Sequence, residues 1–284
     1  MSSVLTKFER IGAKAVVQDV RDGEQFSIDV RGGTFAIRKP PEIALEVLDF
    51  DAFDRHLLLL TRGPEKARFL CGHDERHWFV AAIPESSPVT TVEAAKEALK
   101  PEEILGTERG LGKREKNLRR NERRIRQGEW FFIPTPGFVP PKGTIILKNE
   151  PLGRMRNGRF ISRPHLCTEL VRFGGENIFV PRVQLPTRDW RDWRQVPRAR
   201  QELQARLEQE VGTGLTAAER DVYIERHPEA REWQWESFVR NPEVYVRGRV
   251  KHPDHKVLRL KVWHKVVQNT ELRAKAMSYV AFID

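Results

Sequence analysis

HLLLLTRGPEKARFLCGHDERHWFVAAI, residues 56–83, is the stretch that decides the fold. It contains three apolar runs, at 56–60, 67–71 and 77–83. Apolar runs of about four to eight residues bounded by turn signals are typical of buried strands. Gly63-Pro64 and residues 72–76 separate the runs, and both segments have the composition of turns. The stretch therefore predicts three strands that follow one another through short turns.

The residues on either side extend this pattern. Upstream lie four further segments rich in strand-forming residues, at 14–20, 26–30, 34–38 and 43–48. Downstream, Thr90-Thr91-Val92-Glu93 fits a capping box, so we expect a helix to begin there and to end before Pro101. Many strands at short spacing with one closing helix predict a β-rich N-terminal domain over residues 1–105.

The second half of the chain mixes both element types. Residues 129–133 are expected to form a strand, and residues 244–250 are expected to pair with 257–267 across a turn at 252–255. Helices are expected at 196–210, 215–226, 230–239 and 271–277. The predicted fold class is α+β, with the β-rich N-terminal domain, a basic connecting helix (106–128) and a mixed α/β C-terminal domain (129–284).

The composition excludes several classes of protein. Among 284 residues, 39% are hydrophobic and 15 are Phe, which argues against a disordered chain. No apolar run reaches the roughly 18 residues of a membrane helix, so no membrane association is expected. Cys71 and Cys167 are the two cysteines, in no metal-binding spacing, and they indicate neither a disulfide scaffold nor a Cys-rich zinc site. The first residues lack a signal-peptide pattern, so we expect a cytoplasmic location.

Positive charge is concentrated in residues 109–126. Nine Lys/Arg against two Glu give this segment a net charge of +7, out of +10 for the whole chain. Nothing between Lys113 and Gln127 breaks a helix, and Gly128 supplies a stop signal. Because Leu111, Leu118 and Ile125 provide only a thin apolar stripe, a helix here is expected to lie on the surface or to connect two domains.

A basic helix of this kind predicts binding to nucleic acid, DNA or RNA. Arginine favours bidentate contacts with phosphate, and Asn117 and Asn121 lie four residues apart on one helix face, from which they could read adenine edges. The predicted phosphate-binding residues are Arg109, Lys113, Arg114, Lys116, Arg119, Arg120, Arg123, Arg124, Arg126, Arg154, Arg156 and Arg159. Trp190 and Trp193, interleaved with arginines, could stack on unpaired bases or simply anchor a turn in the core.

Two groups of histidines suggest a different chemistry. His73 and His77 lie four residues apart with Glu75 between them, but the order differs from HExxH and the flanks resemble hairpin strands. His252 and His255, with His264 farther on, could converge on paired strands and bind zinc through nitrogen. The alternative is that these imidazoles are polar turn residues. His165-Leu-Cys167 could be a catalytic Cys/His pair, although a half-buried strand is the simpler interpretation.

These patterns support three hypotheses about function. The leading one is a nucleic-acid-binding protein that contacts phosphates through residues 109–126. The second is a metal-dependent hydrolase, such as a nuclease, in which a divalent metal is held by His252, His255 and His264 or by His73 and His77. The third is a protein-interaction module whose basic helix docks on an acidic partner.

Overall fold

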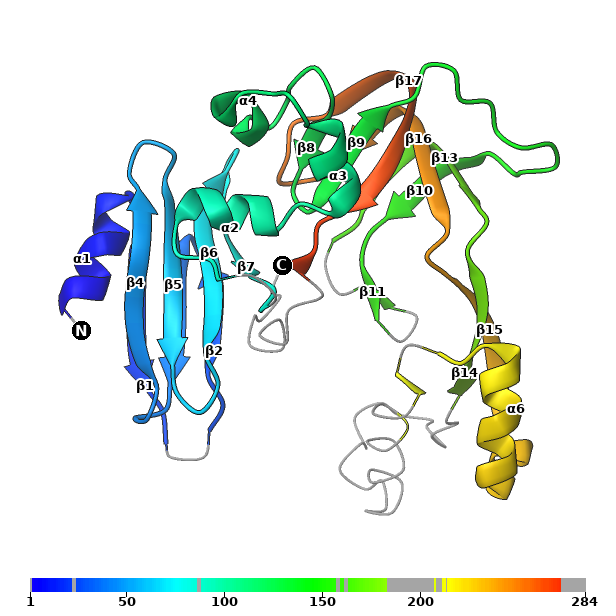
Figure 1. Ribbon diagram of the computed structural model, residues 1–284, viewed down its shortest axis with the longest axis horizontal. Helices are drawn as coiled ribbons and strands as arrows, with labels where there is room; N and C mark the ends of the chain where they lie inside the picture. Colours follow the sequence, from blue (N-terminus) through cyan, green and yellow to red (C-terminus); the bar gives the residue numbers. More distant parts are fainter. Residues whose placement is uncertain are drawn as a thin grey trace. The chain divides into compact units, whose positions relative to one another are not determined.

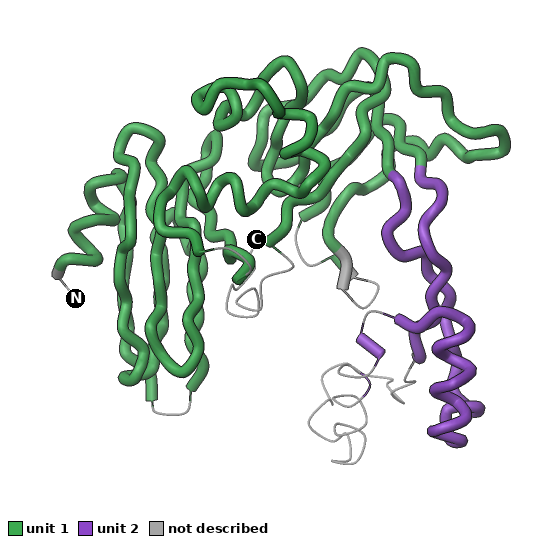
Figure 2. Tube along the Cα trace, in the orientation of Figure 1, with its two compact units in different colours: residues 1–171, 244–284 green, residues 172–243 purple. Residues whose placement is uncertain are grey.

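The chain folds into two compact units (Figure 2). The computed structural model describes residues 2–21, 24–85, 88–156, 159–160, 163–182, 207, 211–212 and 214–271. Unit 1 comprises residues 1–171 and 244–284, and unit 2 comprises residues 172–243. The boundaries predicted at 105 and 128 both lie inside unit 1. The α+β class is confirmed, with strands more abundant than helices.

The quoted stretch forms three strands of a four-stranded antiparallel sheet in unit 1 (Figure 1). The strands are β4 (Ala44–Asp51), β5 (His56–Arg62), β6 (Ala67–Asp74) and β7 (His77–Ala82), in that spatial order. Both faces of β5 are buried, which explains its unbroken run of leucines. Leu57 and Leu59 belong to one hydrophobic core, whereas Leu58 belongs to another on the opposite face.

A second, three-stranded sheet and a helix complete the larger of these cores. The sheet has the order β1 (Lys14–Asp19), β3 (Thr34–Lys39), β2 (Ser27–Arg31), in which β1 runs parallel to β3. Helix α1 (Ser2–Arg10), which the sequence patterns did not predict, buries Phe8 against Phe35, with ring centroids 5.0 Å apart. All seven strands expected in the first hundred residues are confirmed.

The opposite face of the four-stranded sheet is covered by α2 (Val92–Ala98). Thr91, not Thr90, is the N-cap, and its hydroxyl accepts a hydrogen bond from the Ala94 amide at 3.1 Å. Ala95 and Leu99 pack with Leu58 and Leu70 beneath the helix. A short helix, α3 (Glu102–Thr107), follows and buries Ile104.

The prediction of one continuous helix over 113–127 is wrong. Helix α4 contains only Lys113–Asn117, and Leu118 is already extended, with ψ of 147°. Beyond it, Arg120 bridges to Ile125, and β8 (Ile125–Gln127) pairs with β9 (Trp130–Pro134). The expected strand at 129–133 is thereby confirmed.

Buried polar contacts explain why the helix ends. Asn121 forms a turn in which its Oδ1 accepts hydrogen bonds from the amides of Arg123 and Arg124, each at 2.9 Å. The guanidinium of Arg124 donates to the carbonyl oxygens of Lys116, Leu118 and Arg119. The carbonyls of Lys116 and Arg119 also accept hydrogen bonds from Lys100 Nζ and from the Arg126 amide, so a further helical turn is not needed to supply their donors. Helix propensity is a weak preference, and these tertiary contacts override it.

Six further strands form a sheet of order β10-β13-β16-β17-β9-β8 (Figure 1). Its other members are β10 (Leu147–Leu152), β13 (His165–Phe173), β16 (Glu243–Lys251) and β17 (Leu258–Gln268). The expected pairing of 244–250 with 257–267 is confirmed. One face buries Trp130, Phe132, Cys167 and Val246. A small hairpin, β11 (Met155–Arg156) and β12 (Arg159–Phe160), follows β10.

Unit 2 contains a two-stranded antiparallel sheet and a helix. Strand β14 (Glu176–Arg182) pairs with β15 (Gln234–Arg240), while α6 (Ala217–Arg226) and the 3₁₀ helix η2 (Pro228–Glu232) lie between them in sequence. The helix expected at 230–239 is wrong, because most of these residues pair with β14 instead. Helices are also expected at 196–210 and 271–277, but most residues of both segments lie outside the described part of the chain. None of the described helices is long and apolar enough to cross a membrane.

Candidate metal centre

Three histidines of unit 1 converge in one place. His165 begins β13, and His252 and His255 belong to the turn between β16 and β17. One ligand nitrogen from each ring lies within 4.8 Å of those of the other two. The rings of His165 and His252 are stacked with centroids 4.4 Å apart, and His252 and His255 are 4.8 Å apart. The fold therefore brings a strand residue to two residues of a distant turn.

His165 is the most unusual member of this cluster. It is only 2% exposed, and neither ring nitrogen has a hydrogen-bond partner. Burial, reinforced by His252 and His255, lowers the pKa of His165 to about 3. The imidazole is therefore neutral at neutral pH. A buried polar group without a partner costs free energy, so two such nitrogens in one ring indicate a site shaped for something besides packing.

Hydrogen bonds assign the roles of the two nitrogens of His252. Nε2 lies 3.1 Å from the backbone oxygen of Arg163, to which it donates as N–H. Nδ1 accepts a hydrogen bond from the Asp254 amide at 3.2 Å. This fixes the Nε2–H tautomer by the network around it. The lone pair of Nδ1 is thus the one available to a metal ion. Metal binding there would replace the long hydrogen bond from the Asp254 amide.

His255 is held between two other turns of unit 1. Its Nδ1 lies 3.7 Å from Oε2 of Glu75, in the β6–β7 turn. Its Nε2 lies beside Gly128 in the β8–β9 turn. If residue 128 had a side chain, its Cβ atom would lie 3.3 Å from this nitrogen. Gly128 has φ of +57°, so glycine both forms this turn and leaves space beside the ring. Burial, followed by the effect of His252, lowers the pKa of His255 to about 4.

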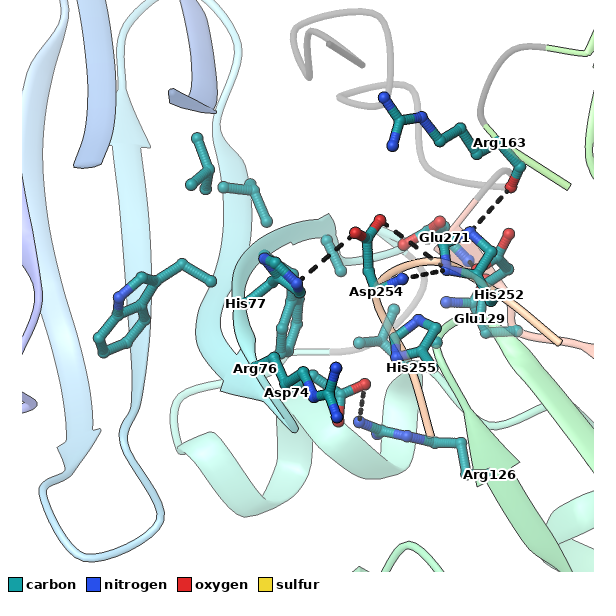
Figure 3. Close-up of a pocket in the computed structure, with 18 of the residues that line it drawn as sticks. Asp74, Arg76, His77, Arg126, Glu129, Arg163, His252, Asp254, His255 and Glu271 are labelled. Atoms are coloured by element: carbon teal, nitrogen blue, oxygen red, sulfur yellow. Dashed lines mark hydrogen bonds and ion pairs between the residues drawn. The ribbon is translucent and has the colours of Figure 1, made fainter. Parts of the chain in front are cut away.

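The cluster lines a cavity of about 490 Å³ within unit 1 (Figure 3). Acidic and basic side chains line it in equal number: Asp29, Asp74, Glu129, Asp254 and Glu271 against Arg76, Lys96, Arg126, Arg154 and Arg163. Many of them pair. Asp254 lies 3.6 Å from His77 and 3.8 Å from His252, so it connects the cluster to the β7 strand. Charged groups therefore surround the three imidazoles.

The other predicted metal ligands lie elsewhere. His264 is buried in β17, where its Nδ1 bonds the backbone oxygen of Val262 at 2.8 Å. His73 packs edge-on against Trp78, with centroids 4.9 Å apart. His77 lines the cavity but contacts Asp254 and is not a member of the cluster. The structure thus unites His252 and His255 with His165 in place of His264.

The arginines predicted to bind phosphate have diverse environments. Arg119 pairs with both Asp74 and Glu75, and Arg126 lies 3.7 Å from Asp74. Arg124 is buried against Glu108. Arg154 is buried between Glu129 and Glu271. Residues that remain exposed are Arg109, Lys113, Arg114, Arg120 and Arg123, with Lys116 half-buried.

Of the other residues predicted to bind nucleic acid, some lie outside the described part of the structure and one has a structural role. The side chains of Arg156 and Arg159 are among those left undescribed, and Trp190 and Trp193 lie outside the described residues. Asn121 does not face outward as proposed for base reading, because its side chain bonds Glu108 and its own turn. The long-range position of His165 explains why sequence spacing missed it: nothing local links the start of β13 to the β16–β17 turn.

The donor set fits a transition-metal ion of borderline softness. Neutral imidazoles are preferred ligands of zinc and similar ions. Two nitrogens on one tetrahedral zinc ion, each bonded at about 2.0–2.1 Å, are about 3.3 Å apart. The present separations reach 4.8 Å, so binding requires at least one ring to rotate inward.

No protein-family model, no curated protein and no solved structure matches the chain.

Proposed function

We propose that unit 1 is a metal-dependent hydrolase whose divalent ion is held by His165, His252 and His255. The observation that carries the proposal is the pair of buried, unpartnered nitrogens of His165 beside two further imidazoles. Three protein ligands with an open position are typical of catalytic zinc sites, where the ion acts as a Lewis acid and activates water.

The surrounding residues would support such a reaction. His252 donates its Nε2–H to the backbone oxygen of Arg163, the kind of contact that fixes the orientation of a metal-binding imidazole. Asp254, 3.8 Å from His252, is placed to accept a proton from water in the cavity. Arg126 lines the same cavity and can neutralise an anionic group of a substrate.

The first test is metal content. Protein purified without chelators should contain about one equivalent of zinc or a similar divalent ion, measured by elemental analysis. His165→Ala should reduce this to a small fraction, and His165→Gln provides a second variant that leaves less empty space. His73→Ala, which changes a histidine outside the cluster, should retain the metal. Equal metal loss in His73→Ala, or none in folded His165 variants, would contradict the site.

The second test is catalysis. Wild-type protein should hydrolyse at least one of a panel of nitrophenyl acetate, phosphate and phosphodiester substrates. Activity should disappear with a chelator and return when the ion is restored. Asp254→Asn should lower kcat by about 10²–10⁴-fold while metal content stays unchanged, because general base catalysis contributes about that factor. Activity that survives complete removal of metal would refute the hydrolase proposal.

Nucleic-acid binding remains a second candidate, favoured by the five exposed cations of residues 109–123. If about four of them contact phosphates, log K against log salt should have a slope of about −4 on duplex DNA. Arg109, Arg114, Arg120 and Arg123 changed together to Gln should flatten this slope by about 3. This set avoids Arg119 and Arg124, which form internal ion pairs.

A matched variant makes this salt titration specific. Lys14, Arg21, Lys66 and Lys142 are also exposed cations of unit 1. Changing these four to Gln removes the same charge and should leave the slope nearly unchanged. Equal slopes for the two quadruple variants would assign any binding to net charge and not to the segment 109–123.

A further inference from the structure

Glu75 occupies a strained and well-anchored position next to His255. It lies at the β6–β7 turn with φ of +44°, a left-handed conformation that non-glycine residues rarely adopt. Residues held in such conformations need surrounding contacts that compensate for the strain. Oε2 of Glu75 accepts a hydrogen bond from the Lys256 amide at 2.8 Å. The side chain therefore ties the β6–β7 turn to the segment that carries His255.

Arg119 holds the other carboxylate oxygen. Its Nη1 lies 2.9 Å from Oε1 of Glu75, and its Nη2 pairs with Asp74. Arg119 is half-buried and brings the chain that follows α4 onto the same turn. Glu75 is thus fixed at both oxygens, by an arginine on one side and a backbone amide on the other.

This arrangement places one carboxylate oxygen close to one nitrogen of His255. Oε2 of Glu75 lies 3.7 Å from Nδ1, a buried nitrogen with no hydrogen-bond partner. A shift of less than about 1 Å would bring the two atoms to ordinary hydrogen-bond distance. Nε2, the other nitrogen, lies on the side of Gly128, where the missing side chain leaves space.

We propose that Glu75 is a positioning residue for the metal centre, and that Arg119 holds Glu75 in place. The inference rests on the proposed metal site. Glu75 accepts a hydrogen bond from Nδ1–H of His255, which selects the tautomer whose Nε2 binds the ion. Carboxylates that accept the second N–H of a metal-binding histidine fix the ring and increase its basicity, and their loss typically lowers metal affinity by about 10–100-fold.

The test uses Co²⁺ as the probe, because its visible ligand-field absorption reports the coordination of the ion. Glu75→Gln should bind Co²⁺ about 10–100-fold more weakly than wild type and give an altered absorption spectrum. Arg119→Gln should weaken binding in the same direction by a smaller factor. Glu122→Gln and Arg120→Gln change exposed residues of the same charge and should match wild type.

The possible outcomes separate this inference from the proposed site. If wild type binds no Co²⁺, or binds it equally after His165→Ala, the metal site itself is wrong. If wild type binds Co²⁺ through His165 but folded Glu75→Gln retains affinity and spectrum, Glu75 serves only the turn and the inference is overturned. Should Glu75→Gln fail to fold, Arg119→Gln decides, since it leaves the carboxylate in place: unchanged affinity and spectrum there overturn the inference.

Discussion

Replacing Arg124 by Met should lower the free energy of unfolding by about 3–5 kcal/mol, the range measured when one partner of a buried ion pair is removed. Arg124 is 2% exposed, and its Nη2 lies 2.7 Å from Oε1 of Glu108, which is 1% exposed. The substitution also removes hydrogen bonds to three backbone oxygens of residues 116–119, although those of Lys116 and Arg119 keep a second donor, Lys100 Nζ and the Arg126 amide respectively. Glu108 would retain Lys100, at 2.8 Å, so part of its charge remains compensated.

Arg123→Met is the matched control for this prediction. Arg123 is the adjacent residue, is exposed, and forms an ion pair with exposed Glu122. Exposed ion pairs contribute about 0–1 kcal/mol, so denaturant unfolding of this variant should resemble wild type. Similar unfolding free energies for Arg123→Met and Arg124→Met would show that the Glu108 network does not hold the segment together.

Acid should destabilise the fold strongly between about pH 6.5 and pH 4. Burial, assisted by Lys96, lowers the pKa of His56 from about 6.5 to about 4. In this range the unfolded chain binds a proton at His56 and the folded chain does not. The stabilisation is therefore complete above pH 6.5 and is lost as pH falls through this window. A shift of this size corresponds to about 3 kcal/mol below pH 4.

The measurement is the free energy of unfolding at pH 7.5 and at pH 4.5, compared between variants. Other buried groups also titrate, so the useful quantity is the difference between the two pH values. His56→Gln should reduce that difference by about 2.5 kcal/mol relative to wild type. His227→Gln, a half-exposed histidine of unit 2, is the control. An equal pH dependence in wild type and His56→Gln would exclude His56 as the source.

Gly72 explains why His56 is buried so tightly. A Cβ atom at residue 72 would lie 2.4 Å from Cδ2 of His56, and Gly72 pairs directly with His56 across β5 and β6. The sequence interpretation treated this glycine as the beginning of a turn. It lies within β6 instead, where its lack of a side chain accommodates the imidazole of the neighbouring strand.

The sequence by itself determined the strand-rich part of this protein. Runs such as 56–60 and 67–71 are long enough and apolar enough that burial dictates their conformation, and adjacent strands joined by short turns pair with their sequence neighbours. Pairing of β16 with β17 follows from the same rule. Hydrophobic periodicity is a local signal, so local pairing can be predicted from it.

Only the tertiary structure decided which conformation the basic segment adopts and which histidines form the cluster. Residues 113–127 have every local feature of a helix, but Glu108 and the Asn121 turn divert the chain after Asn117. His252 and His255 could be chosen from their spacing, whereas His165 joins them through the order of strands in the six-stranded sheet. Long-range contacts depend on how whole elements pack, and no window of the sequence contains that information.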